Sequence, residues 1–140
     1  MISASVEVDR APAVVFDFYA VHHLDNHPRW DPKMELRQVT DGPIGVGTRF
    51  HRRHTRIGSP VEGSMEVVEF EPDTSFGVVI TDATPGGVLE VRSRATFEGI
   101  AGGRTRLTLH VDVPGSEATM DPSMIEASLA RIRDLVEAET

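Results

Sequence analysis

Residues 87–113 alternate apolar and polar side chains through two consecutive segments, and this alternation leaves the chain few possible folds. In GVLEVRSRATFEG every second residue from Leu89 to Phe97 is apolar except Ser93, and RTRLTLHVDV repeats the pattern after the short turn AGG. A period of two is typical of strands that bury one face. Strands joined by turns this short must be antiparallel, because a parallel pair needs a long crossover.

The same criterion predicts five further strands. They lie at residues 2–8, 33–40, 48–57, 61–70 and 76–81. Val67 and Val68 break the alternation in the strand at 61–70, as a β-bulge would. Short turns separate most of these segments, so the sequence predicts one antiparallel meander of about seven strands.

Two regions carry helical periodicity. The segment RAPAVVFDFYAVHHL predicts a helix that ends near His22 or His23, with a short second helical turn before Pro28. Residues 121–139 predict a long helix with Asp121 as N-cap and Pro122 in the first turn. Its apolar stripe is Ile125, Leu129, Ile132 and Val136. A sheet with one apolar face needs a cover, so we expect an α+β fold in which a curved sheet wraps around this helix.

Composition narrows the function classes. The chain has 140 residues, which predicts a single domain over 1–140, and it has no cysteine. Its formal net charge of -8 disfavours binding to nucleic acid or to anionic membranes. The N-terminus lacks the layout of a signal peptide, and no apolar run is long enough for membrane insertion, so a cytoplasmic location is expected.

Several motifs, taken in order, resemble one superfamily. DRAPAVVFDFYAV resembles its strand-to-helix opening, NHPRWDP its Pro-x-Trp-Asp-Pro turn, GVGTRF its Gly-x-Gly-Thr strand start, and VVEFEPDTSFGVV a characteristic turn between strands. From Ile2 to Glu139 the chain is similar to the START-like (Bet v 1-like, SRPBCC) superfamily, and within it to the polyketide cyclase/dehydrase-like group. The resemblance implies the helix-grip fold, with two short helices after the first strand. It does not specify one function, because the superfamily includes binders, lipid carriers, cyclases and chaperone cofactors.

The stretch NHPRWDPKM and the preceding histidines allow two interpretations. The resemblance implies that Trp30 is a structural anchor and that the turn around Asp31 leads into the second strand. The alternative is a metal site, since His23 and His27 have the i, i+4 spacing that can bind one ion. No Glu follows His23 as in HExxH, and Pro28 suggests a fraying helix end. Solvated loop histidines, with no metal and no cofactor, are the expectation.

The segment FHRRH offers a polar site whose orientation alternation cannot decide. Phe50, Arg52 and His54 share one face of the predicted strand, while His51 and Arg53 share the other. If the first set faces inward, Arg52 could bind a carboxylate or phenolate and His54 could carry a proton. If the register is shifted by one residue, both side chains face solvent.

Ser93 interrupts the apolar face of its strand, and it could bind either a ligand or a buried water. The remaining expected ligand contacts are apolar side chains of the predicted strands and helices. They are Phe18, Met34, Leu36, Phe50, Met65, Val78, Leu89, Val91, Leu109, Ile125 and Leu129.

Three functions are compatible with this pattern. The leading hypothesis is binding of a small hydrophobic molecule (a lipid, polyketide or aromatic compound) in a cavity between sheet and C-terminal helix. The second is a cofactor-independent cyclase or dehydratase, with His54 as acid or base and Arg52 stabilising an enolate. The third is a protein-interaction module without a cavity. Exposed sheet edges could also support a homodimer.

Overall fold

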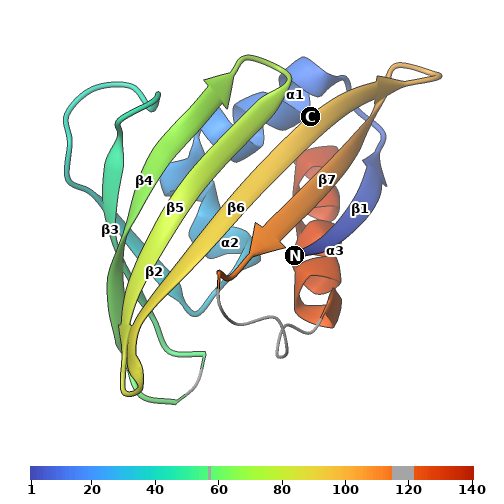
Figure 1. Ribbon diagram of the computed structural model, residues 1–140. Coiled ribbons are helices and arrows are strands. Elements are labelled where there is room, and N and C mark those ends of the chain that lie inside the picture. Colours follow the sequence, from blue (N-terminus) through green and yellow to red (C-terminus); the bar gives the residue numbers. More distant parts are fainter. Residues whose placement is uncertain (57, 115–121) are drawn as a thin grey trace.

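Seven antiparallel strands form a single curved sheet in the computed structural model, which describes residues 1–56, 58–114 and 122–140. The helices all lie on the concave side of this sheet (Figure 1). The elements in chain order are β1 (Ile2–Val8), α1 (Pro12–Phe16), the π-helix η1 (Asp17–Val21), α2 (His23–Trp30), β2 (Met34–Gln38), β3 (Arg49–His54), β4 (Val61–Glu71), β5 (Ser75–Thr84), β6 (Gly87–Ile100), β7 (Arg104–Asp112) and α3 (Pro122–Glu139).

The strand order is β1-β7-β6-β5-β4-β3-β2. Strands β2 to β7 form the predicted meander, and β1 closes the series by pairing antiparallel with β7. The register shifts between Val67 and Glu69, which confirms the predicted bulge. The prediction of an α+β helix-grip fold is therefore confirmed, with the long C-terminal helix held against the concave face (Figure 1).

The alternation in the sequence becomes one buried and one polar face of the sheet. Across the centre of the concave face, Phe50, Met65, Ile80 and Val91 are cross-strand neighbours. On α3 the predicted stripe of Ile125, Leu129, Ile132 and Val136 is buried against this face. The convex face carries ion pairs such as Arg94 with Glu69, and these charged side chains are accessible to water.

Trp30 is the structural anchor that the resemblance implied. Its ring is only 4% exposed and stacks on the ring of Tyr19, with centroids 5.0 Å apart. The guanidinium of Arg131 on α3 donates a hydrogen bond to the Trp30 carbonyl oxygen at 3.1 Å. Trp30 thus joins the end of α2 both to η1 and to the C-terminal helix.

Three predicted boundaries were wrong by three residues, and the first is the end of β3, which lies at His54 and not at residue 57. Helix α2 does not end before Pro28 but continues to Trp30, and Asp31 N–H still donates to the His27 carbonyl oxygen at 3.0 Å. Packing of Trp30 outweighs the local cost of the proline. Strand β5 continues to Thr84, three residues past the prediction, because it pairs with β6 as far as Gly87.

Two further expectations concern the ends of elements and membranes. The predicted N-cap at Asp121 lies outside the described residues. Among the described residues, no helix is both long enough and apolar enough to cross a membrane.

The buried stripe of α3 provides a direct test of the fold. We expect Ile132→Ala to lower the free energy of unfolding by about 3 kcal/mol, because Ile132 is fully buried and the substitution leaves a cavity. Met124→Ala, on the exposed side of the same helix, should change it by less than about 0.5 kcal/mol. Urea denaturation of the two variants measures both values, and equal effects would contradict the packing of α3 described here.

Candidate functional site

An ion pair crosses the concave face at a position where one strand has no side chain. Arg52 on β3, Gly63 on β4 and Asp82 on β5 are direct cross-strand neighbours. Arg52 reaches over Gly63, so that its Nε lies 3.1 Å from Asp82 Oδ1 and its Nη2 donates to Asp82 Oδ2 at 3.3 Å. A Cβ atom at Gly63 would overlap the Asp82 carboxylate and the Thr81 carbonyl oxygen, so the pair depends on the glycine.

The orientation of the FHRRH strand is settled by burial. Arg52 is 4% exposed and His54 is 7% exposed, and both lie on the concave face with Phe50. The alternate residues point outward, where Arg53 pairs with Glu35 and His51 lies 3.5 Å from Glu62. The structure therefore places both candidate polar residues inside the fold.

His54 completes a three-residue cluster with Arg52 and Asp82, which we call the Arg52 cluster. Its Nε2 lies 3.6 Å from Asp82 Oδ2, and Asp82 itself is 4% exposed. Three buried atoms of the cluster have no hydrogen-bond partner among the described residues, namely Arg52 Nε, His54 Nδ1 and Asp82 Oδ1. Although Arg52 Nε and Asp82 Oδ1 are close, the N–H does not point at the oxygen.

The surroundings of the cluster affect its charges. Burial lowers the pKa of Arg52, and the neighbouring Asp82 carboxylate opposes that change. Burial also lowers the pKa of His54, and the positive charges of Arg56 and Arg52 lower it further. His54 is therefore neutral near pH 7, while Arg52 and Asp82 form a charged pair.

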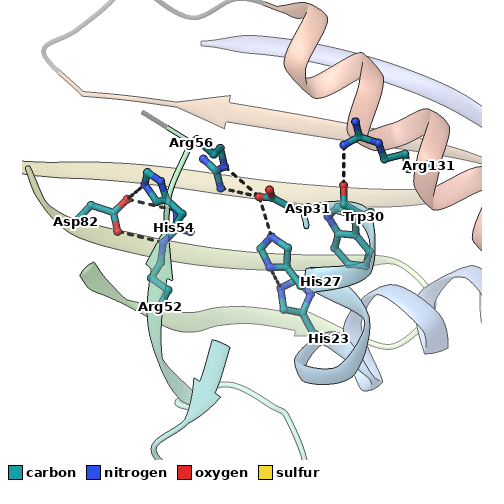
Figure 2. A network of polar contacts seen from close by, with 9 residues as sticks. All are labelled: His23, His27, Trp30, Asp31, Arg52, His54, Arg56, Asp82 and Arg131. Carbon is teal, nitrogen blue, oxygen red and sulfur yellow. Dashed lines mark hydrogen bonds and ion pairs between the residues drawn. The ribbon is translucent and has the colours of Figure 1, made fainter. Parts of the chain in front are cut away.

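A second polar group lies beside the first (Figure 2). His23 Nδ1 donates to the Tyr19 carbonyl oxygen at 2.7 Å, and the His27 and His23 rings are joined by a 3.0 Å hydrogen bond. His27 Nε2 lies 3.9 Å from Asp31, whose carboxylate accepts two hydrogen bonds from Arg56.

The expectation of solvated loop histidines was therefore wrong for His23 and His27. His23 is 2% exposed, and its ring lies against Phe76 and Trp30. Burial lowers the pKa of His23 to about 4 and holds that of His27 well below its usual value. Among the described residues, no group of three or more metal-ligating side chains could hold an ion.

The hydrogen bonds assign the protons of the two neutral rings. A carbonyl can only accept, so His23 carries its proton on Nδ1 and its Nε2 is an acceptor. His27 must then donate from Nδ1, which leaves its Nε2 lone pair facing Asp31. If His27 Nε2 gained a proton, the two rings would donate at both ends, to the Tyr19 carbonyl and to the Asp31 carboxylate. Burial opposes the positive charge that this proton brings.

The predicted ligand contacts other than Arg52 and His54 divide into three groups by burial. Most are buried in the core: Phe18, Met34, Phe50, Met65, Val78, Leu109, Ile125 and Leu129. Leu36, Val91 and Ser93 are partly buried, and Leu89 is 37% exposed although it neighbours Asp82 across the strands. Ser93 faces inward between Val78 and Val111, and its hydroxyl has no hydrogen bond with a described residue.

Two surface hollows of about 660 Å³ each are present in addition. The first lies among α1, η1, α2 and the end of α3, and its lining includes Phe18, Asp25 and Glu139. The second includes Val68 and Arg92 of the convex face. Phe18, expected in the central cavity, thus lines a hollow on the helical side. Neither hollow contains a residue of the Arg52 cluster.

Asp82 and Gly63 were not identified as site residues from the sequence. The signal for Asp82 was available, because it continues the inward positions Val78 and Ile80, but the predicted strand ended at residue 81. Gly63 stood at an inward position between Val61 and Met65. Its partner could be named only once the register with β5 was known.

Comparison with known proteins identifies the family. Residues 1–137 match the family described as polyketide cyclase / dehydrase and lipid transport. The chain belongs to this family. The match spans nearly the whole chain, as the resemblance of the motifs to the polyketide cyclase/dehydrase-like group of the START-like superfamily implied.

Solved structures share the fold of this family member. Ara h 8.0201 superposes with a TM-score of 0.75 at 16% identity, over 99% of this chain and 97% of that one. A truncated norcoclaurine synthase from Thalictrum flavum gives 0.75 at 15% identity, over 99% and 94%. The di-domain aromatase/cyclase BexL gives 0.73 at 20% identity, over 97% of this chain and 46% of that one. Identities this low show a common fold alone.

Among curated proteins, two ATP-dependent phosphoenolpyruvate carboxykinases of Moorella thermoacetica match a short segment. They are 39% and 37% identical over 54 residues. This segment is 37% of the chain but only 10% of either enzyme, so the chain spans about a tenth of the length of these relatives. The activity of these enzymes is not carried over from so short a segment.

Gly63 allows a test of the ion pair that crosses it. We expect Gly63→Ala to lower the free energy of unfolding by about 2 kcal/mol, because the added methyl group overlaps backbone as well as the Asp82 carboxylate. Gly45→Ala is the matched control, since nothing lies within 4 Å of a Cβ placed there. Thermal and urea denaturation compare the two, and a Gly63→Ala protein as stable as the control would refute this arrangement.

The buried histidine pair predicts a dependence of stability on pH. The pKa of His23 is lower in the folded than in the unfolded chain, so the unfolded chain binds the proton more tightly and acid favours unfolding. The contribution of the neutral His23 ring to stability is fully present above about pH 6.5. By pH 4, roughly 3 kcal/mol of this stability should be lost.

His23→Asn isolates this effect, because its amide can still donate to the Tyr19 carbonyl oxygen but does not titrate. Unfolding free energies measured from pH 7 to pH 4 should fall less steeply in His23→Asn than in the unaltered protein. Substitution of the half-exposed His22 by Asn should leave the steep fall unchanged. Parallel curves for all three proteins would show that the buried ring does not control the acid response.

Proposed function

We propose that the protein binds a small hydrophobic molecule on the concave side of the sheet, beside the Arg52 cluster. One observation carries the proposal: inward-facing apolar side chains of β6 become more exposed as the strand approaches the cluster. Ala95 is 1% exposed, Val91 is partly buried, and Leu89 is 37% exposed directly beside Asp82. An apolar surface that faces inward yet stays accessible is suited to a ligand.

The polar cluster supports a binding role for the same region. Burial of an arginine, a carboxylate and an imidazole costs free energy, and the cost falls only when their hydrogen bonds are completed. Arg52 Nε and His54 Nδ1 are left without partners among the described residues. A few convergent polar atoms at the side of an apolar surface orient a ligand that the apolar contacts bind.

Family membership agrees with this function at a coarse level. The family description names polyketide cyclases, dehydrases and lipid transport, all of which handle largely hydrophobic molecules. Norcoclaurine synthase and BexL, an aromatase/cyclase, share the fold. A hydrophobic ligand is common to these descriptions, while its identity is specific to each protein.

A second candidate is a cyclase or dehydratase that uses the same cluster. The observation that favours it is the free Nδ1 of His54, since Asp82 lies 3.6 Å from Nε2 and would stabilise the ring after Nδ1 accepts a proton. Arg52 would then stabilise an enolate formed nearby. Loss of turnover in His54→Phe with ligand binding retained would separate this enzyme from a carrier.

The binding site is tested with a pair of tryptophan substitutions. Val91→Trp places a large ring on the concave face, and Val79→Trp places the same ring on the opposite face of the sheet, one strand away. We expect Val91→Trp to weaken binding of the neutral fluorescent probe N-phenyl-1-naphthylamine at least about tenfold, whereas Val79→Trp should leave it within about twofold.

Circular dichroism of both variants controls for folding. Native mass spectrometry of the purified protein adds an independent readout, because a bound molecule released on denaturation would give the mass of the natural ligand. Equal probe binding by the two variants would place the site elsewhere. Absence of both probe binding and a bound molecule would favour an interaction module.

A further inference from the structure

The unsatisfied atoms of the Arg52 cluster differ in kind. Arg52 Nε carries a hydrogen and can only donate, whereas Asp82 Oδ1 can only accept. His54 is neutral, and the nearby Asp82 Oδ2 favours the tautomer with its proton on Nε2, so Nδ1 is an acceptor. The cluster therefore contains one unpaired donor and two unpaired acceptors, and all three atoms are buried.

The cluster is also electrically balanced. The charge of Arg52 is neutralised by Asp82, and that of the neighbouring Arg56 by Asp31, which accepts its hydrogen bonds at 2.7 and 3.1 Å. The anionic partner that a buried Arg52 requires is thus supplied by the chain itself. An added carboxylate would compete with Asp82 and would bring an unpaired charge into the interior.

We propose that the ligand presents a neutral hydroxyl group, a phenol, enol or alcohol, to the Arg52 cluster. The hydroxyl donates to His54 Nδ1 and accepts from the N–H of Arg52 Nε, which satisfies two of the three free atoms. This inference rests on the proposed binding function and names the chemical class of its ligand.

Other polar groups fit less well. A carboxylate has only acceptors and would face Asp82 Oδ1 and the lone pair of His54, whereas an ammonium group has only donors and would face Arg52. An ether accepts but cannot donate, so it would leave His54 Nδ1 buried without a partner. A hydroxyl is the smallest group that both donates and accepts without adding charge.

Three naphthalene probes separate these cases in the unaltered protein. They are 2-naphthol, 2-methoxynaphthalene and 2-naphthoate, which share one apolar body and differ in the polar group. Isothermal titration calorimetry at pH 7.5 should show 2-naphthol binding about tenfold more tightly than the ether, which lacks the donor, and more tightly still than the carboxylate.

Three variants assign the preference to the cluster. His54→Phe should reduce the advantage of 2-naphthol over the ether to less than about twofold, while His51→Phe, on the outward face of the same strand, should keep it. Asp82→Asn removes the charge that balances Arg52, so it should shift the preference towards 2-naphthoate. If Asp82→Asn does not fold, the unaltered protein and the two histidine variants still decide the question.

The results distinguish this inference from the proposed function. Equal binding of all three probes would overturn the hydroxyl assignment and leave the apolar site standing. Tighter binding of 2-naphthoate by the unaltered protein would overturn it in favour of an anion site. Failure of all three probes to bind, together with failure of N-phenyl-1-naphthylamine, would reject the binding site itself.

Discussion

The concave face of the sheet has to be shielded from water, and a single helix is too narrow to shield it. Seven strands at the usual spacing are roughly 30 Å wide, whereas a helix with its side chains covers about 10 Å. Helix α3 packs near β1 and β7, and α1, η1 and α2 cover a further part of the face (Figure 1). Arg52 and Asp82 are buried on this face, whereas Leu89, near the start of β6, is 37% exposed. The width of the sheet is therefore the reason that several helices, and not α3 alone, share its concave face.

In the polar interior the charged side chains form ion pairs, and few of the buried polar atoms described lack a hydrogen bond. Two arginine–carboxylate pairs lie in this interior, and the pair of Arg56 with Asp31 lies between the pair of Arg52 with Asp82 and the ring of His27 (Figure 2). Replacing such pairs by apolar residues is often neutral or stabilising, so stability alone gives little reason to retain them. The proposed function gives these pairs a role in recognising a ligand, in which His54 Nδ1, without a hydrogen bond to a described residue, would take part.

The π-helix η1 contributes to the same interior. The carbonyl oxygens of Phe18 and Tyr19, in the last turn of η1, accept hydrogen bonds from the Asn26 amide and His23 Nδ1. The carbonyl of Tyr19 thereby determines which nitrogen of His23 carries the proton. The proton position on His23 in turn fixes that of His27, whose Nε2 faces Asp31, so the carbonyl at the end of η1 orders both rings.

The sequence by itself determined the elements of this protein and the inward direction of most side chains, because alternation and helical periodicity are local properties. It predicted the strands, the buried stripe of α3, the bulge at Val67 and the family. It could not choose the face of Arg52, since FHRRH is polar on both sides and a shift of one residue exchanges them. Only the tertiary structure paired Arg52 with Asp82, 30 residues away, because that contact depends on the register of three strands and on the missing side chain of Gly63. Burial of His23 was likewise decided by packing, as nothing local distinguishes it from the exposed His22 beside it.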